Sequence, residues 1–115
     1  MSSGTRCLDR RFRPLAESLI RIARKFGNYR VTSSCRSLRE QQRLYAAYLA
    51  GESRFPVAPP GHSAHQRGMA VDIADPSRDP YHDLFLHALG ASWRSADPSL
   101  VWDESDPIHF EYRPQ

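Results

Sequence analysis

Two short segments contain residues whose types and spacing could bind a catalytic metal ion. The first runs from Ser63 and contains His65, with Asp72 seven residues later; the second contains Asp106 and, three residues on, His109. Two imidazoles and one carboxylate are a usual ligand set for a catalytic Zn²⁺, with a fourth position left for a water that the metal acidifies. The pattern predicts a zinc site made by His65, Asp72 and His109, with Asp106 as the candidate base.

Two predicted strands position these side chains. Residues 69–74 alternate so that Asp72 lies opposite the apolar side chains of the strand, and residues 108–112 place His109 and Glu111 opposite the core face. Both metal-ligating segments are therefore expected to present their polar side chains on the face of a sheet that is away from the core.

The rest of the chain alternates predicted helices with short strands. Proline, glycine and capping residues set the expected boundaries. We expect a helix from about Pro14 with a stop at Gly27, a strand at 29–32, a helix opened by a capping box at Ser37–Glu40 and ended by Gly51, a proline-rich loop at 52–64, a helix from Asp79-Pro80 closed by Gly90, and a short strand near 100–102.

Apolar spacing predicts which helical side chains are buried. The first helix has apolar residues at steps of three and four, and the second has aromatic and aliphatic residues at helical spacing. The predicted core positions are Phe12, Leu15, Ala16, Leu19, Ile22, Ala23 and Phe26 in the first helix, Tyr45, Tyr48 and Leu49 in the second, and Trp93 and Trp102 further on. We expect His62, His82 and His87 to be surface or helix-face residues rather than ligands.

Length and composition predict one globular domain. The chain has 115 residues, 40% apolar and 25% charged, and residues 1–115 are expected to form one domain whose first eight residues are flexible or loosely packed. The net charge of +3 and pI of about 9.2 suit an anionic partner such as a cell wall or nucleic acid, although a solvated surface explains most arginines. There is no compact basic run with stacking aromatics, so we expect no nucleic-acid partner.

The N-terminal residues lack the apolar run of a signal peptide, and no stretch is long and apolar enough to span a membrane. We expect a monomer made in the cytoplasm. The two cysteines, Cys7 and Cys35, belong to no CxxC pair. A bridge between them is possible, but the reducing cytosol favours buried free thiols.

At this point the motifs resemble those of a known family. The elements Ser-x-His-x-x-Gly-x-Ala-x-Asp at 63–72 and Asp-x-x-His-Phe at 106–110, with Thr32 to Ser37 and Glu40-Gln41 upstream, are similar to those of the zinc D-alanyl-D-alanine carboxypeptidase and L-alanyl-D-glutamate endopeptidase family. The similarity runs from about residue 12 to residue 112. It implies a small α+β domain with an antiparallel sheet and flanking helices, a fold shared with the signalling domain of hedgehog proteins.

The resemblance also assigns roles to individual residues. It implies that His65, Asp72 and His109 bind Zn²⁺, that Asp106 is the base, and that Arg36 binds or polarises the substrate. Ser63 is expected to hydrogen-bond the substrate or support the site, although capping the local turn needs the same hydroxyl. Without a metal, the histidines would be a hydrogen-bonded pair, Asp72 and Asp106 turn caps, and Arg36 a surface residue.

The implied substrate is the stem peptide of bacterial peptidoglycan. An aspartate base resembles the phage endolysin branch, so the first expectation is an L-alanyl-D-glutamate endopeptidase that reaches the wall by holin-type release or in a virion. The alternatives are a D-alanyl-D-alanine carboxypeptidase or dipeptidase and, in another class, a non-catalytic zinc-containing wall-binding domain. Cys35 departs from the family pattern before the arginine, where it would be a small buried filler or an adventitious metal ligand.

Overall fold

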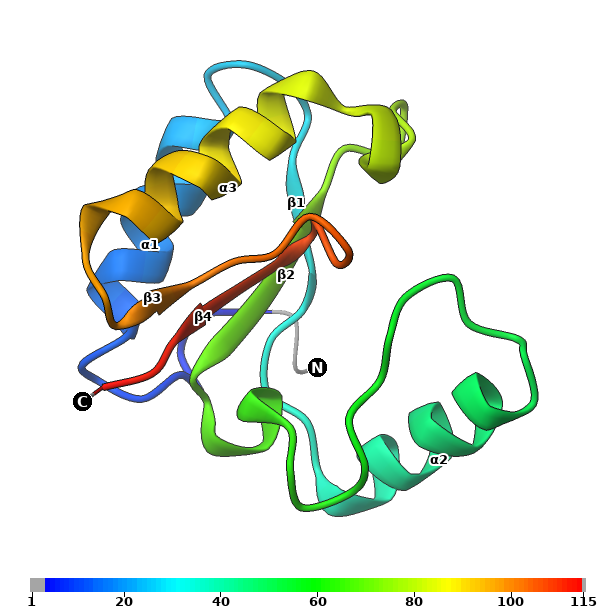
Figure 1. Ribbon diagram of the computed structural model, residues 1–115. Helices are drawn as coiled ribbons and strands as arrows, with labels where there is room; N and C mark the ends of the chain where they lie inside the picture. The colour runs from blue at the N-terminus through cyan, green and yellow to red at the C-terminus, as the bar shows by residue number, and fades with distance from the viewer. Residues whose placement is uncertain (1–3, 115) are drawn as a thin grey trace.

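A four-stranded antiparallel sheet forms the centre of the α+β fold, with strand order β1-β2-β4-β3 (Figure 1). The computed structural model describes residues 4–114. Among these residues, no helix has the length and apolar character needed to cross a membrane. The elements in chain order are α1 (Arg13–Ala23), β1 (Arg30–Ser33), α2 (Leu38–Leu49), the 3-10 turn η1 (Ala64–Arg67), β2 (Ala70–Ala74), the 3-10 turn η2 (Pro80–His82), α3 (Leu84–Ala96), β3 (Leu100–Val101) and β4 (His109–Tyr112).

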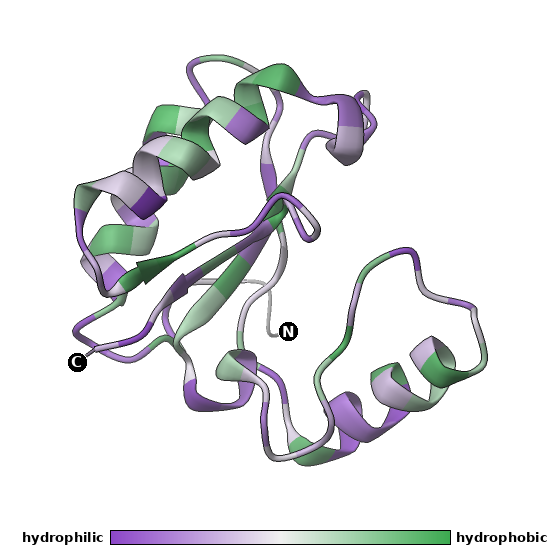
Figure 2. Cartoon of the chain, viewed as in Figure 1, coloured by the Kyte–Doolittle hydropathy of each residue, from purple (hydrophilic) through white to green (hydrophobic). Residues whose placement is uncertain are grey.

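Helices α1 and α3 lie side by side along the sheet, and hydrophobic residues follow these two helices and the strands (Figures 1 and 2). The buried face of α1 begins with Phe12 just before the helix and recurs at helical spacing. The prediction also included Leu15, Ile22 and Phe26, but these are exposed, at 37%, 46% and 58%. The buried stripe of the helix runs through Ile20 instead, and Phe26 lies beyond the end of the helix. The buried residues of this stripe are Phe12, Ala16, Leu19, Ile20 and Ala23.

The predicted alternation of the central strands is confirmed. Val71 of β2 pairs with Phe110 of β4, and both side chains belong to the hydrophobic core. One position on, Asp72 pairs with His109. Because successive side chains point to opposite faces of a sheet, this register turns the polar pair away from the core.

Both ends of α3 (Leu84–Ala96) differ from the prediction. Asp79 caps only η2, whereas Asp83 caps α3 by accepting a hydrogen bond from the Leu86 amide. Gly90 does not end the helix, which continues to Ala96. Gly90 is needed for packing instead, since a Cβ there would clash with the indole ring of Trp102.

Helix α2 stands away from the sheet (Figure 1), and its capping box at Ser37–Glu40 is confirmed. The prediction that its aromatic and aliphatic side chains are core residues is wrong. Tyr48 is 39% exposed and Leu49 is 67% exposed, because no layer of the core covers this part of the helix.

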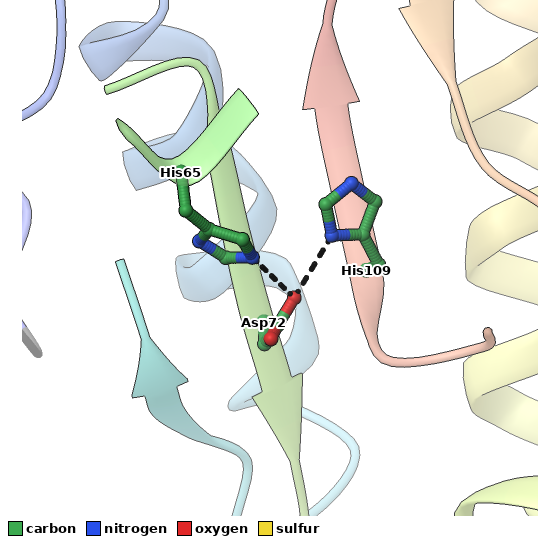
Figure 3. A group of neighbouring side chains, drawn as sticks. All are labelled: His65, Asp72 and His109. Carbon is green, nitrogen blue, oxygen red and sulfur yellow. Dashed lines mark hydrogen bonds and ion pairs between the residues drawn. The ribbon is translucent and has the colours of Figure 1, made fainter. Parts of the chain in front are cut away.

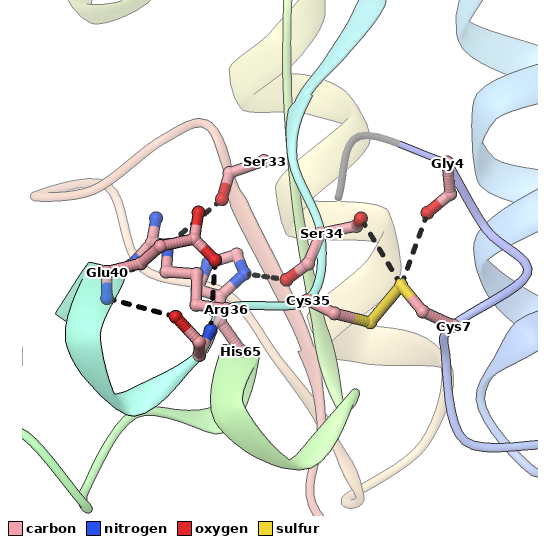
Figure 4. Close-up of a disulfide and its surroundings, with 9 residues drawn as sticks. Gly4, Cys7, Ser33, Ser34, Cys35, Arg36, Glu40 and His65 are labelled. Atoms are coloured by element: carbon pink, nitrogen blue, oxygen red, sulfur yellow. Dashed lines mark hydrogen bonds between the residues drawn. A yellow bond between two sulfur atoms is a disulfide. The ribbon is translucent and has the colours of Figure 1, made fainter. Parts of the chain in front are cut away.

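The N-terminal segment is tied to the body of the protein. The expectation of free thiols is wrong, since Cys7 and Cys35 form a disulfide (Figure 4). Leu8 is buried, and the amide of Asp9 donates to the carbonyl of Gly68 at 3.0 Å. The segment from Cys7 onward is thus not loosely packed; residues 1–3 of the predicted flexible segment lie outside the described part.

Candidate metal centre

The three predicted ligands meet at one point on the open face of the sheet. His65 comes from η1, Asp72 from β2 and His109 from the first position of β4 (Figure 3). One ligand atom from each residue lies within 4.8 Å of the other two. Residues from three separate elements thus form a group that could hold a metal ion.

His65 is held with one ring nitrogen facing the site. The side chain is 1% exposed, and its Nδ1 lies 2.5 Å from the carbonyl oxygen of Ser34. A carbonyl oxygen can only accept a hydrogen bond, so the neutral ring carries its proton on Nδ1. Its lone pair is then on Nε2, which lies 3.1 Å from Asp72 Oδ1 and is the atom that could bind a metal ion. The Ser63 hydroxyl caps η1 by accepting from the His65 amide at 3.2 Å, so its capping role is present in the structure.

His109 faces the site with Nδ1, whereas His65 faces it with Nε2. Its Nδ1 lies 3.1 Å from Asp72 Oδ1, and its Nε2 lies 2.8 Å from Glu111 Oε1. Each imidazole therefore directs one nitrogen at the same carboxylate oxygen while a separate acceptor holds the other nitrogen. Metal-ligating histidines in proteins are usually oriented in this way, with the nitrogen that does not bind the metal hydrogen-bonded to an acceptor.

Charges within the group are strongly coupled. Burial alone would raise the pKa of Asp72, but the two imidazoles outweigh burial and hold that pKa far below its usual range. Burial lowers the pKa of His109, yet its hydrogen bonds to Asp72 and Glu111 outweigh burial and raise it to about 10. A metal ion at this point would replace protons on the imidazoles, so metal binding and protonation compete.

Asp106 supplies the observation that tests the fit of a metal. Its Oδ1 is buried and, among the described residues, has no hydrogen-bond partner. Burial raises the pKa of Asp106, the charge of His109 lowers it and the charge of Asp72 raises it, and the net pKa is about 6. A buried carboxylate oxygen without a partner, next to two imidazoles and a carboxylate, fits a site built around a dication and a water.

Arg36 binds Oδ2 of Asp72, the carboxylate oxygen that does not face the two histidines. Its Nη2 donates to Asp72 Oδ2 at 3.1 Å, while Nε donates to Ser33 Oγ at 3.0 Å and Nη1 to Gln41 Oε1 at 3.2 Å. The side chain is 14% exposed. Arg36 thus orients Asp72 as well as lining the cleft where a substrate contact was predicted.

A cleft of about 490 Å³ opens over these side chains. Its polar wall contains the predicted site residues, and its apolar wall comes from α2 and the loop after it, through Leu44, Phe55 and Val57. His62 also lines the cleft, but it is exposed and is not part of the metal-binding group.

Two residues of the site were not predicted. Gln41 is fully buried between Arg36 and the carbonyl of Ala58, and Glu111 is 6% exposed beside His109. Glu111 could have been found from its position, because residues two apart on a strand share a face. Gln41 was part of the family motif at 40–41, but its role depends on its contacts with Arg36 and with the carbonyl of Ala58, which the sequence does not show.

Comparisons with known proteins agree with the fold and the motifs. The model of the D-alanyl-D-alanine carboxypeptidase (VanY) family matches residues 5–97. The structure of VanYB in complex with D-alanine-D-alanine is 25% identical, with a TM-score of 0.66, and the match covers 93% of this chain and 72% of that chain. No curated protein gives a significant match.

Two further structures are similar in fold. The D,D-dipeptidase VanXYg in complex with a D-Ala-D-Ala phosphinate analogue is 20% identical, with a TM-score of 0.65 over 91% of this chain and 50% of that chain. A D,D-pentapeptidase VanY variant in complex with Zn(II) is 24% identical, with a TM-score of 0.58 over 93% of this chain and 73% of that chain. Since the family model spans most of the sequence and the fold agrees with it, the chain belongs to the D-alanyl-D-alanine carboxypeptidase (VanY) family and is a peptidase.

Proposed function

We propose that this protein is a zinc-dependent peptidase that cleaves the stem peptide of bacterial peptidoglycan. The main support is the group formed by His65, Asp72 and His109, which lines the same cleft as the carboxyl group of Asp106. A carboxylate in that position is suited to accept a proton from a water in the cleft. The ligands bound in the related structures, D-alanine-D-alanine and Zn(II), support the substrate class and the metal.

In this proposal His65, Asp72 and His109 hold the Zn²⁺. When bound, the ion lowers the pKa of a water and polarises the peptide carbonyl. Asp106, ionised above a pH of about 6, accepts the proton of the attacking water on its carboxylate. It then delivers that proton to the leaving nitrogen, so that one C–O bond forms and the C–N bond breaks.

Arg36 keeps Asp72 in place during this reaction through the contact of Nη2 with Oδ2. Because three of its donors are used by Ser33, Gln41 and Asp72, its remaining N–H groups are the ones open to a substrate oxygen. Negative charge on the reacting carbonyl oxygen would be stabilised there.

Between the possible bonds, we propose D-alanyl-D-alanine carboxypeptidase activity first, on the support of the family model and the VanYB complex. One observation favours the L-alanyl-D-glutamate endopeptidase as the second candidate. Both arginines that line the cleft are paired with carboxylates, Arg36 with Asp72 and Arg113 with Glu111, whereas a carboxypeptidase must bind a terminal carboxylate.

The site of action proposed here is the cell wall, outside a reducing cytosol. The disulfide between Cys7 and Cys35 supports this location, because disulfides persist in oxidising environments.

Mass spectrometry of purified peptidoglycan digested by the zinc-loaded protein tests the proposal. Released D-alanine would establish the carboxypeptidase, and new N-terminal glutamate would establish the endopeptidase. The Asp106→Asn variant should retain zinc and lose about 10²–10⁴-fold in rate, whereas His109→Ala should also lose the metal. Asp97→Asn, at the exposed end of α3, is the matched control and should remain fully active. Absence of product from walls of several chemotypes would refute the proposal.

A further inference from the structure

We propose that Glu111, supported by Arg113, is a positioning residue that fixes the orientation of His109 and so strengthens metal binding. The inference rests on the proposed zinc site and concerns a residue outside the ligand set. Glu111 does not belong to the group that could hold the ion, yet it contacts one of its members directly.

The two oxygens of Glu111 have separate partners. Oε1 lies 2.8 Å from His109 Nε2, and Oε2 accepts two hydrogen bonds from Arg113, at 2.7 Å from Nη2 and 3.0 Å from Nε. With Nε2 donating to a carboxylate, the neutral ring of His109 has its free electron pair on Nδ1, which is the atom that faces Asp72. Glu111 thus selects the tautomer that the site requires.

The backbone of Glu111 lies between two neighbouring strands of the sheet. The residue lies in β4 and pairs with Ala70 of β2 on one side and with Val101 of β3 on the other. Its carbonyl also accepts a hydrogen bond from Trp93 Nε1 at 3.2 Å. A carboxylate fixed in this way holds the imidazole two residues earlier on the same strand at a defined angle.

The other histidine is anchored differently. His65 donates Nδ1–H to the neutral carbonyl of Ser34, whereas His109 donates Nε2–H to a charged carboxylate. A carboxylate partner increases the basicity of a ligating imidazole more than a carbonyl does. We therefore expect that the loss of the Glu111 carboxylate lowers the metal affinity by more than the small energy of an ordinary surface ion pair.

A purely structural ion pair between Glu111 and Arg113 is the alternative. Arg113 is 67% exposed, and pairs involving an exposed arginine contribute little to stability. Glu111 itself is 6% exposed, so its burial has to be compensated, and His109, whose side chain is 21% exposed, is the less exposed of its two partners. The structural alternative predicts a change in unfolding and none in metal affinity.

Competition between the protein and a chromophoric chelator for Zn²⁺ separates the two explanations. We expect Glu111→Gln to weaken zinc binding about 10- to 100-fold. Arg113→Gln should weaken it less, in the same direction, and because Arg113 is largely exposed this variant also tests the inference if Glu111→Gln fails to fold. Asp97→Asn, a matched carboxylate-to-amide change away from the site, should bind zinc as wild type does.

Thermal unfolding of the metal-free variants checks that a loss of affinity is not a loss of fold. Weaker zinc binding with an unchanged metal-free melting temperature supports the inference. Zinc affinity within twofold of wild type for both Glu111→Gln and Arg113→Gln would overturn it while leaving the proposed function intact. A wild-type protein that binds no zinc would instead overturn both, and because no substrate is involved, the two failures are distinguishable.

Discussion

Removal of the disulfide between Cys7 and Cys35 should destabilise the protein strongly. The cysteines are 28 residues apart in sequence, and the entropy of closing a loop of that length in the unfolded chain corresponds to about 3.5 kcal/mol. Small domains have unfolding free energies of about 5–15 kcal/mol, so this loss is a large share of the total. The Cys7→Ser/Cys35→Ser variant should melt about 10–15 °C below the oxidised wild type.

The same change should also weaken the metal centre, because Cys35 lies between two residues that support it (Figure 4). The carbonyl of Ser34 holds His65, and the side chain of Arg36 holds Asp72. The Arg36 amide additionally donates to the His65 carbonyl at 3.1 Å. Without the disulfide this segment gains freedom, and we expect zinc affinity to fall together with stability.

Urea unfolding followed by tryptophan fluorescence measures the first effect, and chelator competition measures the second. Reduced wild-type protein is the control, and it should match the double serine variant in both assays. A loss of less than 1 kcal/mol, with unchanged zinc affinity, would refute the reasoning from loop closure and from the position of Cys35.

Three further outcomes are expected at the site and in the core. Because burial raises the pKa of Asp106 to about 6 and only its ionised form accepts a proton, the rate should fall about tenfold per pH unit below pH 6; a rate that is flat down to pH 5 would contradict the role of the base. The same raised pKa means that the folded protein holds a proton more tightly than the unfolded chain, so stability is lost as pH rises through 4 to 6. The metal-free Asp106→Asn variant should therefore melt at a higher temperature than wild type at pH 7 in calorimetry, and an equal or lower melting temperature would be inconsistent with this sign. Gly90→Ala should cost about 1–3 kcal/mol in urea unfolding, since its Cβ would meet the ring of Trp102, and an unchanged midpoint would show that the ring can move.

The residues that the sequence could identify are those whose roles depend on local pattern. Alternation along a strand was enough to place Asp72 and His109 on the open face, and the capping box was enough to begin α2. Glu111 was placed beside His109 by the same alternation, although its role needed the distance between the two side chains.

Features that depend on tertiary contact could not be obtained in this way. Gly90 has the appearance of a helix stop, and only the packing of Trp102 shows why the helix needs it in its interior. The pairing of Cys7 with Cys35 depends on a Cα–Cα distance of 6.3 Å that no spacing in the sequence expresses. For Leu49, helical spacing indicated a buried face, but the fold provides no layer to cover it.

Because Asp72 pairs directly with His109 across β2 and β4, metal binding depends on the correct register of these two strands. A slip of one residue between these strands would set Phe110 opposite Asp72 and turn His109 toward the apolar layer. Only the native register can then bind the ion, so the free energy of binding is added to that register alone. Zinc present during refolding would in this way select correctly paired sheets from misaligned ones, before any substrate is encountered.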